Sequence, residues 1–340
     1  MTILGISGQN WHGRTIYLSA CQDCVRLDKV YHISYLCKRF LSQTFPPTGI
    51  LFYNVCMKTL GLGAHKSKLD VRDHKDKELS FAVALPDKYF VDTTSLGMRM
   101  QYSIGKCIGE GNAKKSDQLF NIYSSDDFIY LGAKSIDGNL IEGSSIRSAL
   151  KFMQKSGVCL HSSFNIPVNY DMTYADYIKY KPSNEALSEA QKYKIGQYFS
   201  IPIDSGTIMA SLIKYGILVA RMDVGVEWYE PSWKSKDILP LRKSKNPISG
   251  HCVAIVGYDT TLVQGKTAIY IDNSWSSNWA DNGRGYFFLE DYSPTEVWAV
   301  TLNPVPENNL ISLEILQSII MIFQKIGLWT KSISRSIINP

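Results

Sequence analysis

Three residue types that together support nucleophilic catalysis stand far apart in this sequence. His251 opens an apolar run, and Asn273 follows a second apolar run two residues before Trp275. Cys107 lies well upstream of both. A cysteine can attack a carbonyl carbon, an imidazole can carry its proton, and an amide can orient the imidazole. The pattern predicts a cysteine-dependent acyl-transfer site whose parts meet only after folding.

Each of these residues would have a separate role. A free cysteine is mainly a thiol near neutral pH, so Cys107 is expected to open a helix whose macrodipole favours the thiolate. His251 would take the thiol proton and later give it to the leaving amine. Asn273 would hold the imidazole, and Trp275 would cover that hydrogen bond. Gln101 would donate a side-chain N–H to an oxyanion hole.

At these residues the sequence resembles the papain-like cysteine peptidases. Three of the family's motifs are recognisable in order along the chain, at 101–107, 250–253 and 273–276. Two glycines and an alanine of those motifs are replaced here, by Tyr102, Ser276 and Cys252. Ile108 follows the nucleophile, where the family usually has an aromatic residue. The resemblance covers roughly residues 85–303.

The resemblance implies an α+β, papain-like fold of two lobes. A helical lobe would carry the cysteine, and a β-rich lobe would carry the histidine and the asparagine. The chain would then consist of an N-terminal segment of unknown role at 1–84, a peptidase domain at 85–303 and a C-terminal amphipathic helix at 304–340. The N-terminal segment could occlude the cleft between the lobes or serve as an accessory region.

The function that the resemblance implies is that of a cysteine-type peptidase. This hydrolase would cleave peptide bonds through a thioester on Cys107, with His251 as base and then acid. Its substrate would be a peptide or protein, with no cofactor or metal, and the sequence leaves endopeptidase and exopeptidase action open. Tyr102 and Ile108 are expected to narrow the site and make cleavage selective. The alternative is a catalytically inactive papain-like protein that serves in binding or as a scaffold.

The composition fits a globular enzyme. The chain has 340 residues, of which 45% are hydrophobic, and a net charge of +5, which is too mild to indicate a nucleic-acid partner. Its seven cysteines cannot all pair in disulfides because their number is odd. The first residues lack the basic start and apolar run of a secretory signal peptide. We therefore expect reduced cysteines and an intracellular location.

Two further patterns lie outside the peptidase-like region. Cys21, Cys24, His32 and Cys37 could be drawn as a tetrahedral zinc site, but their spacing matches no standard zinc pattern, and a chance arrangement is favoured. Residues 309–329 carry apolar side chains at helical spacing, interrupted by charges that disfavour a membrane span. This helix is expected to dock on the protein itself or on a partner helix, in preference to a membrane surface.

Overall fold

The computed structural model describes residues 60–68, 70, 85–229 and 240–302, together with strands β1 (Gly8–Gln9) and β2 (Thr15–Ile16). β1 and β2 pair antiparallel within a unit, Met1–Thr59, that is distinct from the unit beginning at Leu60. The predicted C-terminal helix lies outside the described residues, as do the four residues that could be drawn as a zinc site, Cys21, Cys24, His32 and Cys37. Of the helices that are described, none is both long and apolar enough to cross a membrane.

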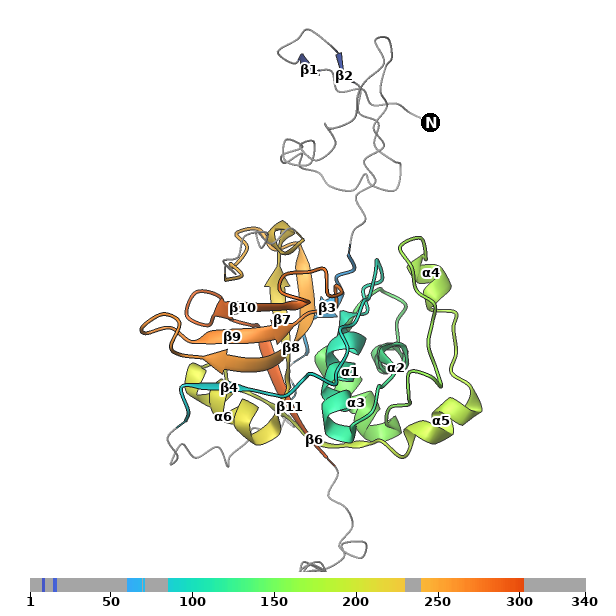
Figure 1. Cartoon of the computed structure of the whole chain (residues 1–340). Helices are drawn as coiled ribbons and strands as arrows, with labels where there is room; N and C mark the ends of the chain where they lie inside the picture. Colours follow the sequence, from blue (N-terminus) through green and yellow to red (C-terminus); the bar gives the residue numbers. More distant parts are fainter. Residues whose placement is uncertain are drawn as a thin grey trace, which may run out of the picture. The chain divides into compact units, whose positions relative to one another are not determined.

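The helical lobe of the main unit contains α1 (Cys107–Phe120), α2 (Asp126–Asp137), α3 (Ile146–Ser156), α4 (Tyr174–Tyr177) and α5 (Asn184–Ala190) (Figure 1). α2 begins after Ser125, whose hydroxyl accepts the backbone N–H of Phe128, and it ends at Gly138, which has a φ of 66°. α3 follows the same plan and ends at Gly157, with a φ of 83°. Serine caps and left-handed glycines thus set the limits of both helices.

The second lobe is built on a sheet that has seven strands within the described residues. Its strands are β4 (Lys88–Phe90), β6 (Ile195–Ser200), β7 (Leu218–Val224), β8 (Ser249–Asp259), β9 (Ala268–Asp272), β10 (Arg284–Phe288) and β11 (Glu296–Leu302). The strand order is β10-β9-β8-β7-β11-β6, and β4 also pairs with β8. All of these pairings are antiparallel. α6 (Ser205–Tyr215) packs against the sheet (Figure 1).

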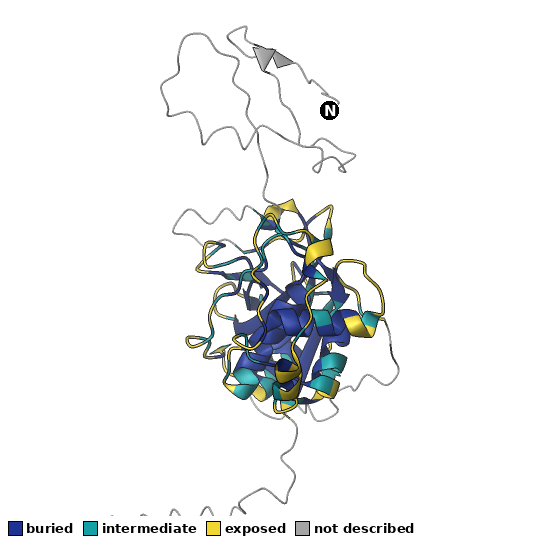
Figure 2. Cartoon of the chain, turned by 90° about the vertical axis from the view of Figure 1, so that its right-hand side faces the viewer, coloured by how far each residue is buried: buried dark blue, intermediate teal, exposed yellow. Residues whose placement is uncertain are grey.

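Helix α1 lies where the two lobes meet. One apolar cluster contains Cys107 and Ala113 of α1 together with Val219 of β7, Cys252 of β8 and Trp298 of β11. Most of the helix is buried as a result. Figure 2 shows the buried residues gathered in the interior of the described part of the chain. Because α1 packs directly on β8, its N-terminus lies beside the strand that carries His251. The predicted two-lobed α+β architecture is confirmed.

Two glycines allow this close packing of α1. A Cβ at Gly109 would lie 2.3 Å from the carbonyl oxygen of Asp126, and one at Gly111 would lie 2.7 Å from the Sγ of Cys252. Real Cβ atoms essentially never come this close to such neighbours. Glycine at both positions therefore lets α1 approach α2 on one side and β8 on the other, despite its cost to helix stability.

Residues 60–68 belong to the same unit as the two lobes. Within them, β3 (Ala64–His65) pairs in parallel with β5 (Ser144–Ser145), directly before α3. The predicted division of the chain at residue 84 stays a prediction. The described part shows that a piece of the predicted N-terminal segment packs against the helical lobe.

Candidate active site

The structure brings His251 and Asn273 into contact and places Cys107 beside the strand that carries His251. Cys107 is the first residue of α1, and its thiol faces the backbone N–H of Cys252, the residue after His251. The Nε2 atom of His251 lies 2.7 Å from the Oδ1 atom of Asn273. These two residues meet because β8 and β9 are neighbours and Asn273 directly follows β9. All three side chains are buried.

The imidazole of His251 has one nitrogen engaged and one available. Nε2 is held by Asn273, whereas Nδ1 has no hydrogen-bond partner among the described residues. The ring of Trp275 lies against the imidazole with a centroid separation of 4.7 Å, and Trp228 approaches at 6.0 Å. These two indoles exclude water from the bond between His251 and Asn273. The free Nδ1 is the atom that could exchange a proton with a thiol.

The side-chain amide of Gln101 is fixed in one orientation. Its Oε1 accepts a hydrogen bond of 2.5 Å from the hydroxyl of Ser274, so its NH2 group points the other way. That group donates to the carbonyl oxygen of Gly61 at 2.6 Å and to that of Ile104 at 3.1 Å. The predicted oxyanion donor therefore already holds a peptide carbonyl. The orienting role of Ser274 escaped sequence reasoning, which recognised this residue only as part of a motif.

Burial, not the helix macrodipole, dominates the titration of the site. Burial raises the pKa of the Cys107 thiol to about 11, although the backbone N–H groups of Cys252, Gly63 and Ile108 act to lower it. Burial also lowers the pKa of His251 to about 4, against the opposing effect of Asn273. The expectation of a lowered thiol pKa is wrong for this state of the protein. Near neutral pH the site holds a neutral thiol and a neutral imidazole.

Residues 60–64 run through the site and contact both lobes. On the side of the helical lobe, the backbone N–H of Gly61 donates to the carbonyl oxygen of Tyr102, a residue of that lobe, at 2.8 Å. From the sheet lobe, the hydroxyl of Tyr229 donates to the carbonyl oxygen of Leu60 at 3.1 Å. The backbone N–H of Gly63 faces the Cys107 thiol. This stretch covers Cys107, which is fully buried.

The path of the segment beyond the nucleophile is fixed by charged side chains. Arg221 of β7 donates from Nε to the carbonyl oxygen of Ala64 at 2.8 Å. Glu296 of β11 accepts the backbone N–H of Ser67 at 2.6 Å, and Arg147 of α3 donates to the carbonyl oxygen of Lys68. Sequence reasoning found none of these contacts. The available signal was the run Gly61-Leu62-Gly63-Ala64, whose small residues suit a confined path.

The replaced family glycines retain a glycine-like backbone. Tyr102 has a φ of 55° and Ser276 a φ of 67°, both in the left-handed region that costs a residue with a side chain about 1–2 kcal/mol. The Tyr102 ring makes an edge contact with Tyr170 at a centroid distance of 5.2 Å. Ile108 is fully buried in the core. The expectation that Tyr102 and Ile108 narrow the site stays a prediction.

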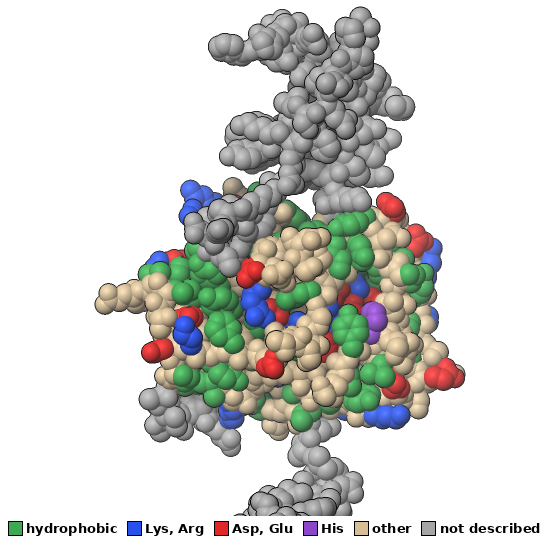
Figure 3. All heavy atoms as spheres, viewed as in Figure 1, with side chains coloured by type: hydrophobic (Ala, Val, Ile, Leu, Met, Phe, Trp, Pro, Cys, Tyr) green, Lys and Arg blue, Asp and Glu red, His purple; other side chains and the backbone are tan. Residues whose placement is uncertain are grey.

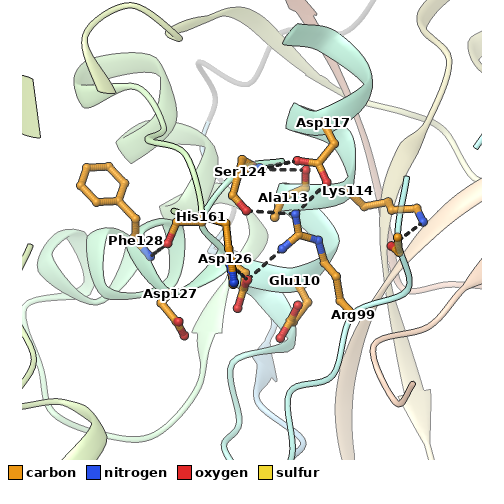
Figure 4. A network of polar contacts seen from close by, with 12 residues as sticks. Arg99, Glu110, Ala113, Lys114, Asp117, Ser124, Asp126, Asp127, Phe128 and His161 are labelled. Atoms are coloured by element: carbon orange, nitrogen blue, oxygen red, sulfur yellow. Dashed lines mark hydrogen bonds and ion pairs between the residues drawn. The ribbon is translucent and has the colours of Figure 1, made fainter. Parts of the chain in front are cut away.

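A network of buried charges surrounds the first turn of α1 (Figure 4). Lys106, directly before the nucleophile, pairs with Asp126, with Asp127 at 2.8 Å and with Glu110 at 3.3 Å. Arg99 pairs with Asp126 at 2.8 Å. Burial and the nearby Asp126 raise the pKa of the Glu110 carboxyl. The network fixes the start of the helix, and its members are too dispersed in sequence to be recognised as a cluster.

The same network borders a cavity of about 290 Å³ on the molecular surface. Acidic, basic and histidine side chains gather in this hollow (Figure 3). Nδ1 of His161 lies 3.9 Å from Oδ1 of Asp126 there. Within the part of the chain that the structure describes, no group of histidine, cysteine and acidic residues is arranged to hold a metal ion.

The fold and the site define a class: a two-lobed α+β protein with a cysteine at the start of a helix, a histidine on the strand beside that helix and an asparagine just after the neighbouring strand. Residues 130–296 match the family model described as "Papain family cysteine protease". The chain belongs to the papain-like cysteine peptidase family.

Solved structures share the fold of this chain, and a curated relative matches part of its sequence. Xylellain, a cysteine protease from Xylella fastidiosa, superposes with a TM-score of 0.61 at 24% identity, over 73% of this chain and 98% of that one. Procathepsin B S9 from Trypanosoma congolense superposes with a TM-score of 0.57 at 14% identity, over 71% and 85% of the two chains. Peptidase 1 from Euroglyphus maynei is 26% identical over 216 residues, 61% of this chain. That match spans 62% of the relative's length.

Proposed function

We propose that the protein is a cysteine peptidase that hydrolyses peptide bonds through a thioester on Cys107. His251 Nδ1 takes the thiol proton, the sulfur attacks the peptide carbonyl, and the oxyanion is held by Gln101. The imidazolium then gives its proton to the leaving amine. A water molecule, deprotonated by the same imidazole, hydrolyses the thioester and restores the thiol.

The observation that carries this proposal is the orientation of His251. Asn273 holds Nε2 at 2.7 Å, and Nδ1 is left without a partner among the described residues. A histidine with a purely structural role would be expected to satisfy both ring nitrogens when fully buried. The alternative, an inactive papain-like binding or scaffold protein, would share this geometry, and the hydrolysis of peptides distinguishes the two.

We further propose that residues 60–68 hold the enzyme closed. The segment occupies the hydrogen-bond donor of Gln101 and covers the thiol. A peptide substrate cannot reach Cys107 until this segment leaves. The competing role, an attached module that binds a partner without blocking the site, does not require such contacts with catalytic groups.

The test is a full-length protein with a site-specific protease site inserted between residues 70 and 85. The chain folds intact and is cut afterwards, so that the segment can dissociate. Peptide-library hydrolysis and labelling by an epoxide thiol probe are measured before and after the cut. A Cys107→Ala protein with the same inserted site is the matched control.

We expect hydrolysis and probe labelling only after the cut, and neither in the Cys107→Ala control. Labelling at Cys107 without hydrolysis of any peptide would favour the binding or scaffold role. Equal hydrolysis before and after the cut would contradict the closed state. A cut protein that unfolds would show that residues 60–68 are part of the core.

A further inference from the structure

The glycines of the occupying segment lie where no side chain fits. A Cβ at Gly61 would lie 2.1 Å from the carbonyl oxygen of Ile104. A Cβ at Gly63 would lie 2.0 Å from the carbonyl oxygen of Gly105. Both obstacles are backbone atoms, so no side-chain rotation can relieve them. The residue between the two glycines, Leu62, is partly buried and packs against the core of the sheet lobe.

The backbone of Ile104 and Gly105, which excludes these side chains and is called the Ile104–Gly105 wall below, is held in place by hydrogen bonds. The carbonyl oxygen of Ile104 accepts hydrogen bonds from the Gln101 side chain at 3.1 Å and from the backbone N–H of Lys106 at 2.8 Å. The backbone N–H of Gly105 donates to Glu142 at 2.6 Å. The loop therefore cannot retreat without losing several buried hydrogen bonds, each of which stabilises it.

The contact between the segment and this wall is reciprocal. A Cβ on Gly105 would lie 2.8 Å from the carbonyl oxygen of Leu62. The backbone of residues 61–63 and the backbone at Gly105 are therefore so close that neither side has room for a side chain. The next residue, Ala64, is 2% exposed and shares a buried cluster with Cys107 and Cys252. The groove beside the nucleophile thus accepts two glycines in alternate positions and then a small side chain.

We propose that this groove recognises extended peptides that contain Gly-x-Gly, with a small residue next in line, and that Gly61-Leu62-Gly63-Ala64 is the built-in example. The inference rests on the proposed peptidase function and names its substrate class. The Ile104–Gly105 wall consists of backbone atoms, which cannot rotate away from a side chain. Only segments with glycine at these two positions therefore fit into the groove. Peptides with a side chain at either of the two glycine positions are excluded by the backbone of Ile104 and Gly105.

The first test uses full-length protein and does not depend on turnover. The rate of Cys107 alkylation by iodoacetamide is measured by mass spectrometry in the wild type and in Gly61→Ala and Gly63→Ala proteins. Displacing the segment exposes the thiol, so we expect alkylation at least tenfold faster in both variants. Gly97→Ala is the matched control, because the nearest atom to a Cβ there is 4.0 Å away. Unchanged rates in folded Gly61→Ala and Gly63→Ala proteins would overturn the proposal.

The second test adds a peptide to the full-length Gly63→Ala protein. A synthetic peptide of residues 60–68 should protect Cys107 from alkylation, and the same peptide with alanine at positions 61 and 63 should require at least tenfold higher concentration. Equal protection by both peptides would overturn the groove's selectivity. Gly-x-Gly members of a peptide library should be hydrolysed preferentially. Selective protection without hydrolysis of any peptide would support the groove's preference and refute the peptidase function.

Discussion

At Cys107, burial and hydrogen bonding act on the thiol in opposite directions. Backbone N–H groups of Cys252, Gly63 and Ile108 favour the thiolate, but the lack of water outweighs them and raises the pKa to about 11. The same lack of water keeps His251 neutral. Burial therefore disfavours both the thiolate of Cys107 and the imidazolium of His251 in this state of the protein.

This balance predicts an unusual pH profile for alkylation of the intact protein. Because only the thiolate reacts, the rate at Cys107 should keep rising with pH and reach half of its plateau value only near pH 11. After residues 60–68 are released by cutting, water reaches the thiol and the midpoint should fall below the ordinary value of 9.0. Iodoacetamide kinetics with mass spectrometry measure both profiles, and Cys107→Ser gives the background from other cysteines. A plateau below pH 8 in the uncut protein would contradict the prediction.

His251 should make the stability of the protein sensitive to acid. Its pKa is about 4 in the folded state against an ordinary value of 6.5, so the unfolded state binds the proton first as the pH falls. The neutral His251 therefore contributes up to about 3 kcal/mol to the free energy of unfolding. This contribution is complete above pH 6.5 and is lost as the pH falls from about 6.5 to 4.

Urea unfolding at pH 7 and pH 4.5 measures this effect in Cys107→Ala protein with and without His251→Asn. The asparagine variant lacks the titrating group, so its loss of stability on acidification should be smaller by about 2–3 kcal/mol. Other titrating groups are common to both proteins and cancel in the comparison. Equal losses in the two proteins would show that His251 is not buried as described.

At the scale of elements, α1 is the structural link between the chemistry and the fold. Its N-terminus carries the nucleophile, and its glycines bring it against α2 and β8. The charge network of Lys106, Glu110 and Asp126 fixes the turn at which the thiol is presented. A small displacement of this helix would move Cys107 away from His251.

We expect Gly109→Ala to destabilise the protein. The added Cβ would lie 2.3 Å from the carbonyl oxygen of Asp126, and overpacking of this kind typically costs 1–3 kcal/mol, which exceeds the gain of about 1 kcal/mol in helix propensity. Thermal unfolding should therefore show a lower Tm than in the wild type. Gly97→Ala, which meets no close neighbour, should leave the Tm nearly unchanged. A higher Tm for Gly109→Ala would mean that α1 and α2 lie further apart.

For the whole molecule, residues 60–68 join the two lobes across the site. The helical lobe contributes Tyr102 and Arg147 to this contact, and the sheet lobe contributes Tyr229, Arg221 and Glu296. Residues 60–68 form hydrogen bonds with both lobes. We therefore expect each of these hydrogen bonds to help keep the segment bound over Cys107. The intracellular location and the docking of the C-terminal helix stay predictions at this scale.

Removing one of these contacts should loosen the segment measurably. Tyr229→Phe deletes the hydrogen bond to the carbonyl oxygen of Leu60, worth about 1 kcal/mol, which corresponds to about fivefold faster alkylation of Cys107. Tyr258→Phe is the control, because it deletes a similar bond, of 2.9 Å to the carbonyl oxygen of Pro86, outside the segment. If both variants react alike, retention of the segment does not depend on Tyr229.

The sequence by itself determined the family and the two lobes, and it predicts Cys107, His251, Asn273, Gln101 and Trp275 as the site residues. This was possible because each catalytic role requires a particular side chain, and the motifs preserve those side chains with their local neighbours. Even the replacement of glycines by Tyr102 and Ser276 left the local backbone in its left-handed form.

Only the tertiary structure decided the protonation state of the site, the path of residues 60–68 and the charge network around Lys106. A pKa depends on everything that excludes water from a group, and for Cys107 this includes a segment more than forty positions upstream. In the sequence, Gly61 and Gly63 resemble any other flexible glycines. Only the folded structure shows that the backbone of Ile104 and Gly105 lies against them. These properties arise from contacts between distant parts of the chain, and no local pattern of residues encodes them.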